Sequence, residues 1–342
     1  MPLKVLHVVP EIDEASGVCR VARLLAREAG GELIACSDCS VARLRDGAYD
    51  EVWVHGMWLP REWRACLAVL SLAREVGTRP RLMRMTHGSL SPVYLERQGK
   101  WKKRLAGPVE RWLFSKTNRV VVTCEAEKAW VREYLGLGDC SDCSDCSDCS
   151  DCSDCSIVKN QPAIEVVDLK RFFRLEEWEE KKVTVEYGDQ KRSLHLLYLG
   201  RRHPLKGVEF LERAVAQLQS EQSNNPNNRT IELHIVSDHF GVELERDWEW
   251  CDVLCLPTLS ENFGLVVAEA LERGKRVIVT DGAPAWGEGL FDCSACSDCS
   301  IERGFGGRLM YLRGYREGTD DERVALLKEA MGKLKGGLEG SR

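Results

Sequence analysis

The sequence predicts an α/β protein made of two similar domains, each with a parallel sheet that helices cover on both faces. Two observations predict this class. Short apolar runs alternate with helical stripes along the chain, and the alternation stops at a charged stretch and then starts again. A length of 342 residues is enough for two domains with a hydrophobic core each. Strands that alternate with helices favour parallel pairing, in which both faces of the sheet are buried.

The first half opens with an apolar run at residues 4–10 (KVLHVVP), which predicts a strand. A helical stripe follows and ends at Gly30 and Gly31, because glycine commonly terminates a helix. The same reasoning predicts strands at ELIAC, DEVWVHG, RLMRMTHG, NRVVVTC and IVKN, and helices at REWRACLAVLSLAREVG, at residues 101–116 and at EAEKAWVREYLG.

A charged stretch at residues 171–193 has no long apolar core, and we interpret it as the junction between the domains, with one short strand pattern, KVTVEY. The strand and helix pattern then restarts at LHLLYLG, KGVEFLERAVAQLQ, IELHIV, CDVLCLP, FGLVVAEALERG and KRVIVT. We therefore expect an N-terminal domain at 1–185, a C-terminal domain at 186–318, and a helix within 319–342 that can pack back on the first domain. In open α/β sheets, ligands bind beyond the carboxyl ends of the strands, so the two domains are expected to face a cleft at those ends.

Charge and hydropathy exclude several classes of protein. A net charge of -6 argues against a general nucleic-acid-binding protein. Acidic residues at Glu11, Asp13 and Glu14 follow the first apolar run, which is not the pattern of a signal peptide. The sequence also has no uninterrupted apolar stretch of about eighteen residues, the length that predicts a membrane-spanning helix. The expected location is the cytoplasm.

Eleven of the sixteen cysteines lie in Asp-Cys-Ser runs: six copies at residues 139–156 and shorter echoes at 35–40 and 292–300. A metal-binding or redox module is one interpretation. Zinc sites, however, normally use two Cys-x2-Cys pairs separated by a loop, and a strict three-residue repeat specifies no set of four ligands. An aspartate before most of these thiols also raises their pKa and disfavours the thiolate. Because all three runs fall at junctions between elements, we interpret them as tolerated insertions that hold no metal.

The most specific pattern in the sequence is PTLSENFGLVVAEALERGKRVIVTDGAPAW, in which seven residues separate Glu261 from Glu269. Glu261 precedes a predicted helix whose first turn would be residues 262–265. Backbone N–H groups in such a turn form an anion site, and Gly264 would let a ligand approach the backbone. Glu269 would lie about two turns into the helix among apolar neighbours, where a ribose diol suits it as a partner. A solvated glutamate on an amphipathic helix is the alternative for Glu269 considered alone.

A basic loop, LGRRHPLKG, follows the first strand of the second half. Arg201, Arg202 and Lys206 would lie at a carboxyl end of the sheet, where fixed cations suit a diphosphate. A basic loop, a helix N-terminus and a diol-binding carboxylate at neighbouring strand ends together predict a sugar-nucleotide pocket.

These segments resemble glycosyltransferase family 4, a family of retaining enzymes with the GT-B fold, in which two Rossmann-like domains face a cleft. The matching segments are LGRRHPLKG, DVLCLPTLSENFGLVVAEAL and GKRVIVTDGAPAW in the second half, and HVVPEIDEASGVCRVARLL, THGSL and VVVTCEAE in the first. The resemblance implies a nucleotide-sugar donor and a glycan or glycolipid acceptor. Within the family, the segments resemble bacterial enzymes of lipopolysaccharide and cell-surface polysaccharide assembly.

The resemblance also implies roles for particular residues. Arg201 and Lys206 would hold the donor diphosphate, and Glu269 the ribose. Glu261 and His87 would be the catalytic candidates, with Glu261 on the sugar hydroxyls and His87 near the reacting sugar. The remaining donor-binding candidates are Gly17, in a glycine-containing loop, and the helix turn of Asn262, Phe263, Gly264 and Leu265.

Two departures from the family pattern affect the donor. The glycine loop has only Gly17 where the family commonly has two glycines, and residues 237–250 are shorter than the segment that usually helps to hold the base. An Asp-x-Asp motif is also lacking in a donor-site context, so we expect neither a divalent metal nor another cofactor. Two alternatives are a Rossmann oxidoreductase, which would need a Gly-x-Gly-x-x-Gly that PEIDEASGVCR lacks, and an inactive scaffold whose cysteine repeats bind metal or act in redox.

The acceptor is indicated only by a basic segment, GKWKKRLAGPVERWLF. Lys100, Lys102, Lys103 and Arg104 lie there among aromatic residues, which suits contact with an anionic membrane surface. An ordinary helix with a solvated basic face explains the pattern equally well. With the family resemblance, we expect a protein that works at the inner face of the membrane without spanning it.

Overall fold

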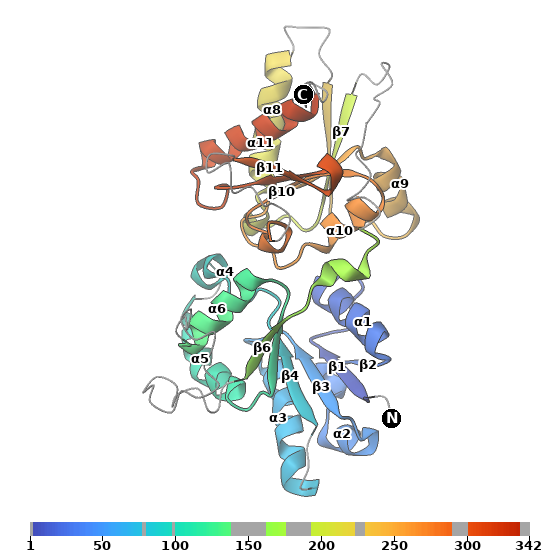
Figure 1. Ribbon diagram of the computed structural model, residues 1–342, viewed down its shortest axis with the longest axis vertical. Coiled ribbons are helices and arrows are strands. Elements are labelled where there is room, and N and C mark those ends of the chain that lie inside the picture. Colours follow the sequence, from blue (N-terminus) through green and yellow to red (C-terminus); the bar gives the residue numbers. More distant parts are fainter. Residues whose placement is uncertain are drawn as a thin grey trace. The chain divides into compact units, whose positions relative to one another are not determined.

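The chain folds as two compact units, Met1–Asp168 and Leu169–Arg342 (Figure 1). The computed structural model describes residues 3–76, 80–97, 100–137, 162–175, 193–222, 230–288 and 300–335. The boundary lies before the expected one at 185, because residues just after Asp168 pack within the second unit. Lys170 Nζ donates to the carbonyl of Glu288 at 3.4 Å, and the ring of Phe173 stacks on that of Phe263 at 6.4 Å.

Among the described residues of unit 1, six parallel strands form one sheet, in the order β2-β1-β3-β4-β5-β6. Its central strands are buried along nearly their whole length, as expected where helices cover both faces. The strands are β1 (Val5–Val9), β2 (Glu32–Ala35), β3 (Glu51–His55), β4 (Arg81–Met85), β5 (Arg119–Val122) and β6 (Ala163–Val166). The helices of this unit are α1 (Gly17–Ala29), α2 (Val41–Gly47), α3 (Pro60–Val76), α4 (Pro92–Arg97), α5 (Lys100–Phe114) and α6 (Glu125–Leu135).

A buried ion pair attaches α5 to the sheet of unit 1. Arg84 Nη1 lies 2.7 Å from Glu110 Oε2, and both side chains are at most 1% exposed. The other oxygen of Glu110 accepts hydrogen bonds from the backbone of Trp58 at 2.6 Å and from the indole of Trp63 at 2.8 Å. Because these bonds satisfy the buried carboxylate, the pair fixes which face of α5 points to the sheet and which to solvent.

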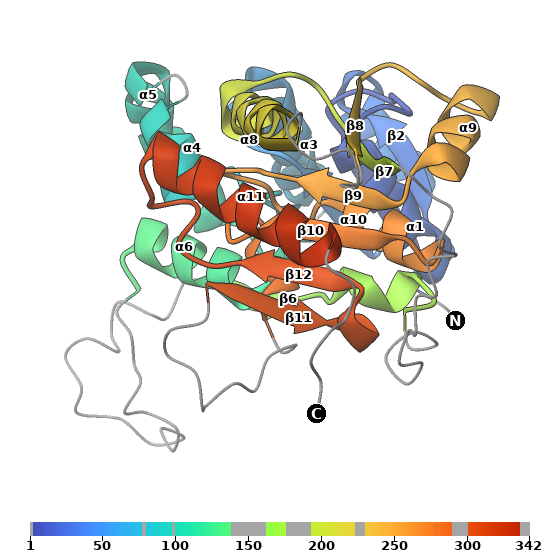
Figure 2. The same ribbon diagram turned by 90° about the horizontal axis from the view of Figure 1, so that it is seen from above.

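In the part of unit 2 that the structure describes, six strands form a second sheet, in the order β11-β12-β10-β9-β7-β8. All its pairs are parallel except that of β11 with β12. Figure 2 shows α8 and α11 on one face of this sheet and α9 and α10 on the other. The strands are β7 (Ser193–Leu199), β8 (Thr230–Val236), β9 (Val253–Leu256), β10 (Arg276–Thr280), β11 (Ile301–Gly304) and β12 (Leu309–Leu312). The helices are α8 (Val208–Gln222), α9 (Val242–Trp250), α10 (Leu265–Glu272) and α11 (Asp320–Lys335).

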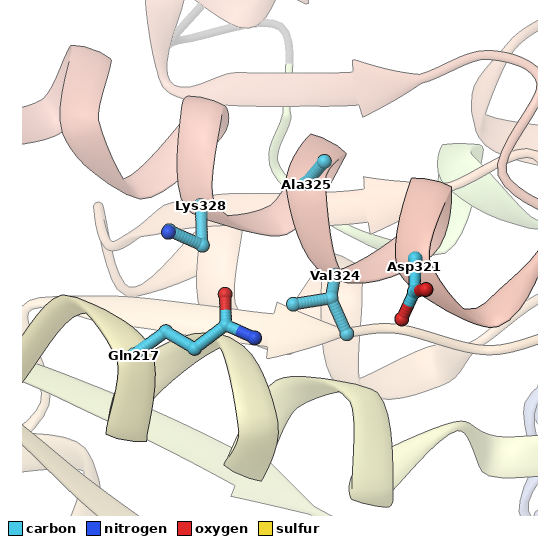
Figure 3. Close-up of a pocket in the computed structure, with 5 residues that line it drawn as sticks. All are labelled: Gln217, Asp321, Val324, Ala325 and Lys328. Carbon is cyan, nitrogen blue, oxygen red and sulfur yellow. The ribbon is translucent and has the colours of Figure 1, made fainter.

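The C-terminal helix, expected as a separate segment, belongs to unit 2, where α11 packs on α8. Two ion pairs join these helices, Arg213 with Asp321 at 2.8 Å and Lys328 with Glu221 at 2.6 Å. Between the helices lies a shallow hollow that Figure 3 shows in close-up, lined by Gln217, Asp321, Val324, Ala325 and Lys328. Two of its lining residues, Asp321 and Lys328, are engaged in the ion pairs between the helices.

One of the three cysteine runs is described, and it lies between β2 and α2, as the sequence predicted. Ser37, Asp38 and Ser40 are exposed, whereas its two thiols face the core. Residues Cys36–Asp38 form a turn of 3-10 helix in which Cys36 is buried in the core of unit 1, with Cys39 packed against the same cluster. Burial raises the pKa of the Cys36 thiol to about 12 and that of Cys39 to about 11, so both are protonated hydrophobic side chains. The run at 139–156 and the run at 292–300, apart from Ser300, lie outside the described residues.

Candidate functional site

Three loops meet at the carboxyl edge of the sheet in unit 2, because the strands that precede them are neighbours. β9 pairs with β7 on one side and with β10 on the other. The carbonyl of Leu205, in the loop after β7, accepts hydrogen bonds from Thr258 Oγ1 at 3.0 Å and from the amide of Leu259 at 2.8 Å. The hydroxyl of Thr280, at the end of β10, donates to the carbonyl of Thr258. The loop after β9 is therefore bonded to both neighbouring loops.

Two glycines permit this close contact. A Cβ atom on Gly207 would lie 2.1 Å from the carbonyl oxygen of Pro257, and one on Gly282 would lie 2.0 Å from that of Thr258. Gly207 also has a positive φ of 62°, which disfavours other residues. Any side chain at either position would push the loops apart.

Lys206 and Glu261 form an ion pair at this junction. Their side chains are 25% and 23% exposed, so the pair lies at the surface of the junction and remains accessible from solvent. Glu261 is held by its backbone, whose amide donates to the carbonyl of Gly282 at 2.8 Å, and its Oε1 accepts from the amide of Asn262 at 3.1 Å. Lys206 was expected to contact the donor diphosphate and Glu261 the sugar hydroxyls. In the structure the two side chains contact each other.

Helix α10 begins later than the sequence predicted. Its first residue is Leu265, and Gly264 is the N-cap with a left-handed φ of 71°. This conformation ends the preceding turn, so Asn262 and Phe263 lie before the helix and only Leu265 of the predicted turn is inside it. Glu269 is consequently about one turn into the helix, not two, and its side chain is buried at 8% exposure.

An aromatic cluster fixes the turn before α10. Phe263 is buried, with its ring 5.1 Å from that of Trp286. The indole N–H of Trp286 donates to the carbonyl of Phe263. The backbone N–H groups that open α10 therefore have a fixed direction, and the first turn of a helix attracts anions.

The two arginines of the basic loop differ in their contacts. Arg202 makes a bidentate pair with Glu212 at 2.7 and 3.1 Å. Arg201 is exposed, and its guanidinium makes no hydrogen bond or ion pair within the described residues. Its backbone carbonyl accepts from the hydroxyl of Tyr198 at 3.1 Å. Of these two cations, Arg201 is the one available to a ligand.

In unit 1, Gly17 is the first residue of α1, after the N-cap Ser16. It is exposed, and a Cβ atom there would meet nothing within 4 Å. The fold itself therefore does not require a glycine at this position.

His87 lies in the turn after β4 and has a left-handed φ of 51°, which is uncommon for a side-chain-bearing residue. The turn is held by Glu127 of α6, which is fully buried. One oxygen of Glu127 accepts from Thr86 Oγ1 at 2.6 Å and from the amide of Gly88, and the other accepts from the amide of Thr123 at 2.8 Å. Sequence reasoning missed Glu127, although it lies in the segment TCEAE directly after β5.

His87 is also the last ring of a hydrogen-bonded chain. His7 Nδ1 lies 2.9 Å from His55 Nε2, and His55 Nδ1 lies 2.9 Å from His87 Nε2. Burial lowers the pKa of His7 to about 4 and that of His87 to about 3. Burial, and then the neighbouring histidines, hold the pKa of His55 well below its usual range. All three imidazoles are therefore neutral near pH 7.

Within the described parts of the chain, no group of three or more histidine, cysteine, aspartate or glutamate side chains is placed to hold a metal ion. Nor does any described helix have the length and apolar character needed to cross a membrane.

Two α/β units, in each of which the described strands form one mainly parallel six-stranded sheet, agree with the GT-B class of glycosyltransferase folds, and comparison with solved structures confirms that class. A trehalose-6-phosphate protein from E. coli bound with UDP-2-fluoro glucose is 10% identical, with 96% of this chain and 91% of that chain covered and a TM-score of 0.55. The catalytic domain of starch synthase IV from Arabidopsis thaliana, bound to ADP and acarbose, is 12% identical with coverages of 97% and 95% and a TM-score of 0.53. A lipopolysaccharide outer core galactosyltransferase in its apo form is 12% identical with coverages of 97% and 91% and a TM-score of 0.50.

Residues 7–139 match the family described as glycosyl transferase 4-like domain. This match confirms the resemblance to family 4 for most of unit 1, including the turn that carries His87. The search of curated proteins found no match.

The neutral histidine chain predicts how stability depends on pH. A histidine whose pKa is lowered by folding binds fewer protons in the folded chain than in the unfolded one, so stability is lost as the pH falls. The loss should begin near the ordinary histidine pKa of 6.5 and continue towards pH 4, at up to about 1.4 kcal/mol per pH unit for each histidine. Urea unfolding followed by circular dichroism at pH 7, 6 and 5 measures this slope.

The matched control for this prediction is His55→Leu, which removes one titrating group. In this variant the free energy of unfolding should fall less steeply between pH 6.5 and 5. An equal slope in the variant and the wild-type protein would show that His55 does not contribute.

Proposed function

We propose that the chain transfers a sugar from a nucleotide-sugar donor to a glycan or glycolipid acceptor, and that the donor binds at the loop junction of unit 2. The observation that carries this proposal is the Lys206–Glu261 pair beside the N-terminus of α10, at the carboxyl ends of β7 and β9. A cation, a helix N-terminus and a carboxylate in one place suit the charged and hydroxyl groups of such a donor. Structures of the same fold hold ADP or UDP-2-fluoro glucose, which supports a nucleotide-binding role.

The ion pair suggests the order in which the donor is engaged. A diphosphate carries more charge than a carboxylate, so it would replace Glu261 as the partner of Lys206. The released Glu261 would then accept hydrogen bonds from sugar hydroxyls, while Arg201 contacts the second phosphate. Glu269 is the proposed partner of the ribose, and Asn262, Phe263, Gly264 and Leu265 form the turn beside the phosphates. Gly17 remains a donor-binding candidate on the family resemblance alone.

For the chemical step we propose retention at the anomeric carbon without a divalent metal or other cofactor. Arg201, Lys206 and the first turn of α10 can stabilise the charge on the leaving diphosphate. The leaving phosphate would help to deprotonate the acceptor on the same face of the sugar. In this proposal His87 orients the sugar or stabilises developing charge, and it is not a nucleophile.

We further propose an acceptor from lipopolysaccharide or surface-polysaccharide assembly, reached by peripheral contact with the inner face of the membrane. The support is an apolar stripe on α5, where Leu105, Val109 and Trp112 are 72%, 38% and 47% exposed at helical spacing. Arg104 is exposed beside this stripe. An apolar stripe beside basic charge suits an anionic lipid surface.

The contacts that α5 makes within unit 1 limit which of its basic residues can contact a membrane surface. Lys103 donates to the carbonyl of Tyr94 at 2.7 Å and lies over the Tyr94 ring, and burial lowers its pKa to about 8. It is therefore engaged within unit 1. The side chains of Lys100 and Lys102 lie outside the described residues.

Donor binding is tested by calorimetry with ADP and UDP. Lys206→Ala and Glu269→Gln should each weaken binding by about 1.5–3 kcal/mol, or about ten- to a hundredfold in Kd, because each removes a charge-assisted hydrogen bond. Arg202→Ala is the matched control, since Arg202 is paired with Glu212 and should leave Kd nearly unchanged. Wild-type affinity in both site variants would remove the donor assignment.

The stereochemical proposal predicts that the product keeps the anomeric configuration of the donor, and that EDTA leaves the rate unchanged because fixed cations balance the diphosphate. NMR of the product and a rate assay with and without chelator measure the two outcomes. An inverted product, or activity lost in EDTA and restored by Mn²⁺, would contradict this mechanism.

Membrane contact is tested by cosedimentation with vesicles of neutral or anionic lipid. Trp112→Ser and Arg104→Gln should each reduce binding to anionic vesicles, because they remove apolar and cationic contact respectively. The control is Phe240→Ser, which changes an exposed aromatic side chain of unit 2 and should bind vesicles like the wild-type protein. Equal binding of all proteins to both kinds of vesicle would exclude α5 as the contact.

A further inference from the structure

Three histidines from neighbouring parts of one sheet are joined in series in unit 1. His7 lies in β1, His55 ends β3, and His87 follows β4. The rings of His7 and His55 have centroids 5.2 Å apart, and those of His55 and His87 lie 5.1 Å apart. With two nitrogen–nitrogen distances of 2.9 Å, each contact is a hydrogen bond that needs one proton between the two rings.

We propose that His7 and His55 are positioning residues that set the tautomer of His87, so that His87 presents its Nδ1–H outward as a hydrogen-bond donor. A neutral imidazole carries one N–H and one acceptor nitrogen. Both hydrogen bonds of the chain must therefore run in the same direction. Either every ring is protonated on Nδ1, or every ring is protonated on Nε2.

The buried end of the chain distinguishes the two directions. His7 is 1% exposed, and its Nε2 has no hydrogen-bond partner within the described residues. If every ring were protonated on Nε2, an N–H donor would be buried there without an acceptor. If every ring is protonated on Nδ1, only a lone pair is buried, and buried donors without partners are the rarer case in proteins. The Nδ1–H direction is therefore favoured.

The Nδ1–H direction determines which nitrogen of His87, at the outer end of the three histidines, carries a proton. His87 Nε2 accepts from His55, so that nitrogen is not available as a base. His87 Nδ1 makes no hydrogen bond within the described residues and carries the proton. Because Glu127 fixes the turn on both sides of His87, this N–H has a set direction. A group of this kind donates to an oxygen that is negatively charged or gains charge during reaction.

The buried position of His7 also excludes a role for the three histidines as a proton path. A proton path needs contact with solvent at its inner end, and His7 has almost none. The chain fixes a tautomer and does not conduct protons to the interior. The identity of the oxygen that His87 contacts rests on the proposed function, whereas the tautomer does not.

The direct test is ¹⁵N NMR of the full chain labelled at histidine, at pH 7, with signals assigned from His7→Asn, His55→Asn and His87→Asn. We expect all three rings to show a protonated Nδ1 and an unprotonated Nε2. A protonated Nε2 on His87, a rapid mixture of its two tautomers, or a doubly protonated ring would overturn the inference.

A matched pair of variants at His55 tests the link between the rings. The amide nitrogen of His55→Asn can stand at the Nδ1 position and still donate to His87, whereas His55→Leu cannot. We expect the Nδ1–H pattern of His87 to persist in His55→Asn and to become a mixture in His55→Leu. An unchanged His87 pattern in His55→Leu would contradict the proposal. If His55→Leu fails to fold, His7→Leu against His7→Asn gives the same comparison one ring further away.

Kinetics separate this inference from the proposed function. With a transferred sugar as the readout, His55→Leu should lower kcat about tenfold with a donor KM within about twofold, as expected when one hydrogen bond made in the transition state is misdirected. An Nδ1–H tautomer without any sugar transfer would contradict the proposed function alone. Sugar transfer with an Nε2–H tautomer would contradict the histidine inference alone.

Discussion

The close backbone contact among three strand-end loops in unit 2 is the constraint on which the candidate donor site depends. The carbonyl of Leu205 bonds the loop after β9 to the loop after β7, and Gly207 and Gly282 provide the space. This contact brings Lys206 beside Glu261, although 54 residues separate them in the sequence. A side chain at either glycine would move the ion pair and the start of α10 together.

In unit 1 a buried carboxylate, that of Glu127, holds two neighbouring strand-end turns together. The turn that carries His87 follows β4, and the turn after β5 is its neighbour. Glu127 is fully buried and bonded to both turns: it accepts from the hydroxyl of Thr86 and the amide of Gly88, on either side of His87, and from the amide of Thr123. The ring of His87 is held by the hydrogen bond between its Nε2 and Nδ1 of His55. The turn and the ring of His87 are therefore held by separate interactions.

Much of the fold and part of the site could be predicted from the sequence. Buried parallel strands appear as continuous apolar runs, so most central strands were correct. The strands β6, which alternates in exposure, β11 and β12 were missed, although β12 is buried and apolar. The strands predicted at IVKN and KVTVEY lie outside the described residues. Lys206 and Glu261 could be placed at strand ends from local patterns alone. Their mutual contact, the pairing of Arg202, the role of Glu127 and the histidine chain could not, because each depends on contacts between residues far apart in the sequence. The late start of α10 depends on the left-handed conformation of Gly264, which sequence permits but does not specify.

The central claim is that fixed cations at this junction bind the two phosphates of a nucleotide-sugar donor. The most direct measurement is calorimetric titration of the wild-type protein with nucleoside diphosphates and the matching monophosphates, at low and at physiological salt. Each diphosphate should bind at least about tenfold more tightly than its monophosphate, because Lys206 and Arg201 would contact different phosphates. Equal affinity for mono- and diphosphates, or no binding of any nucleotide in the series, would contradict the account.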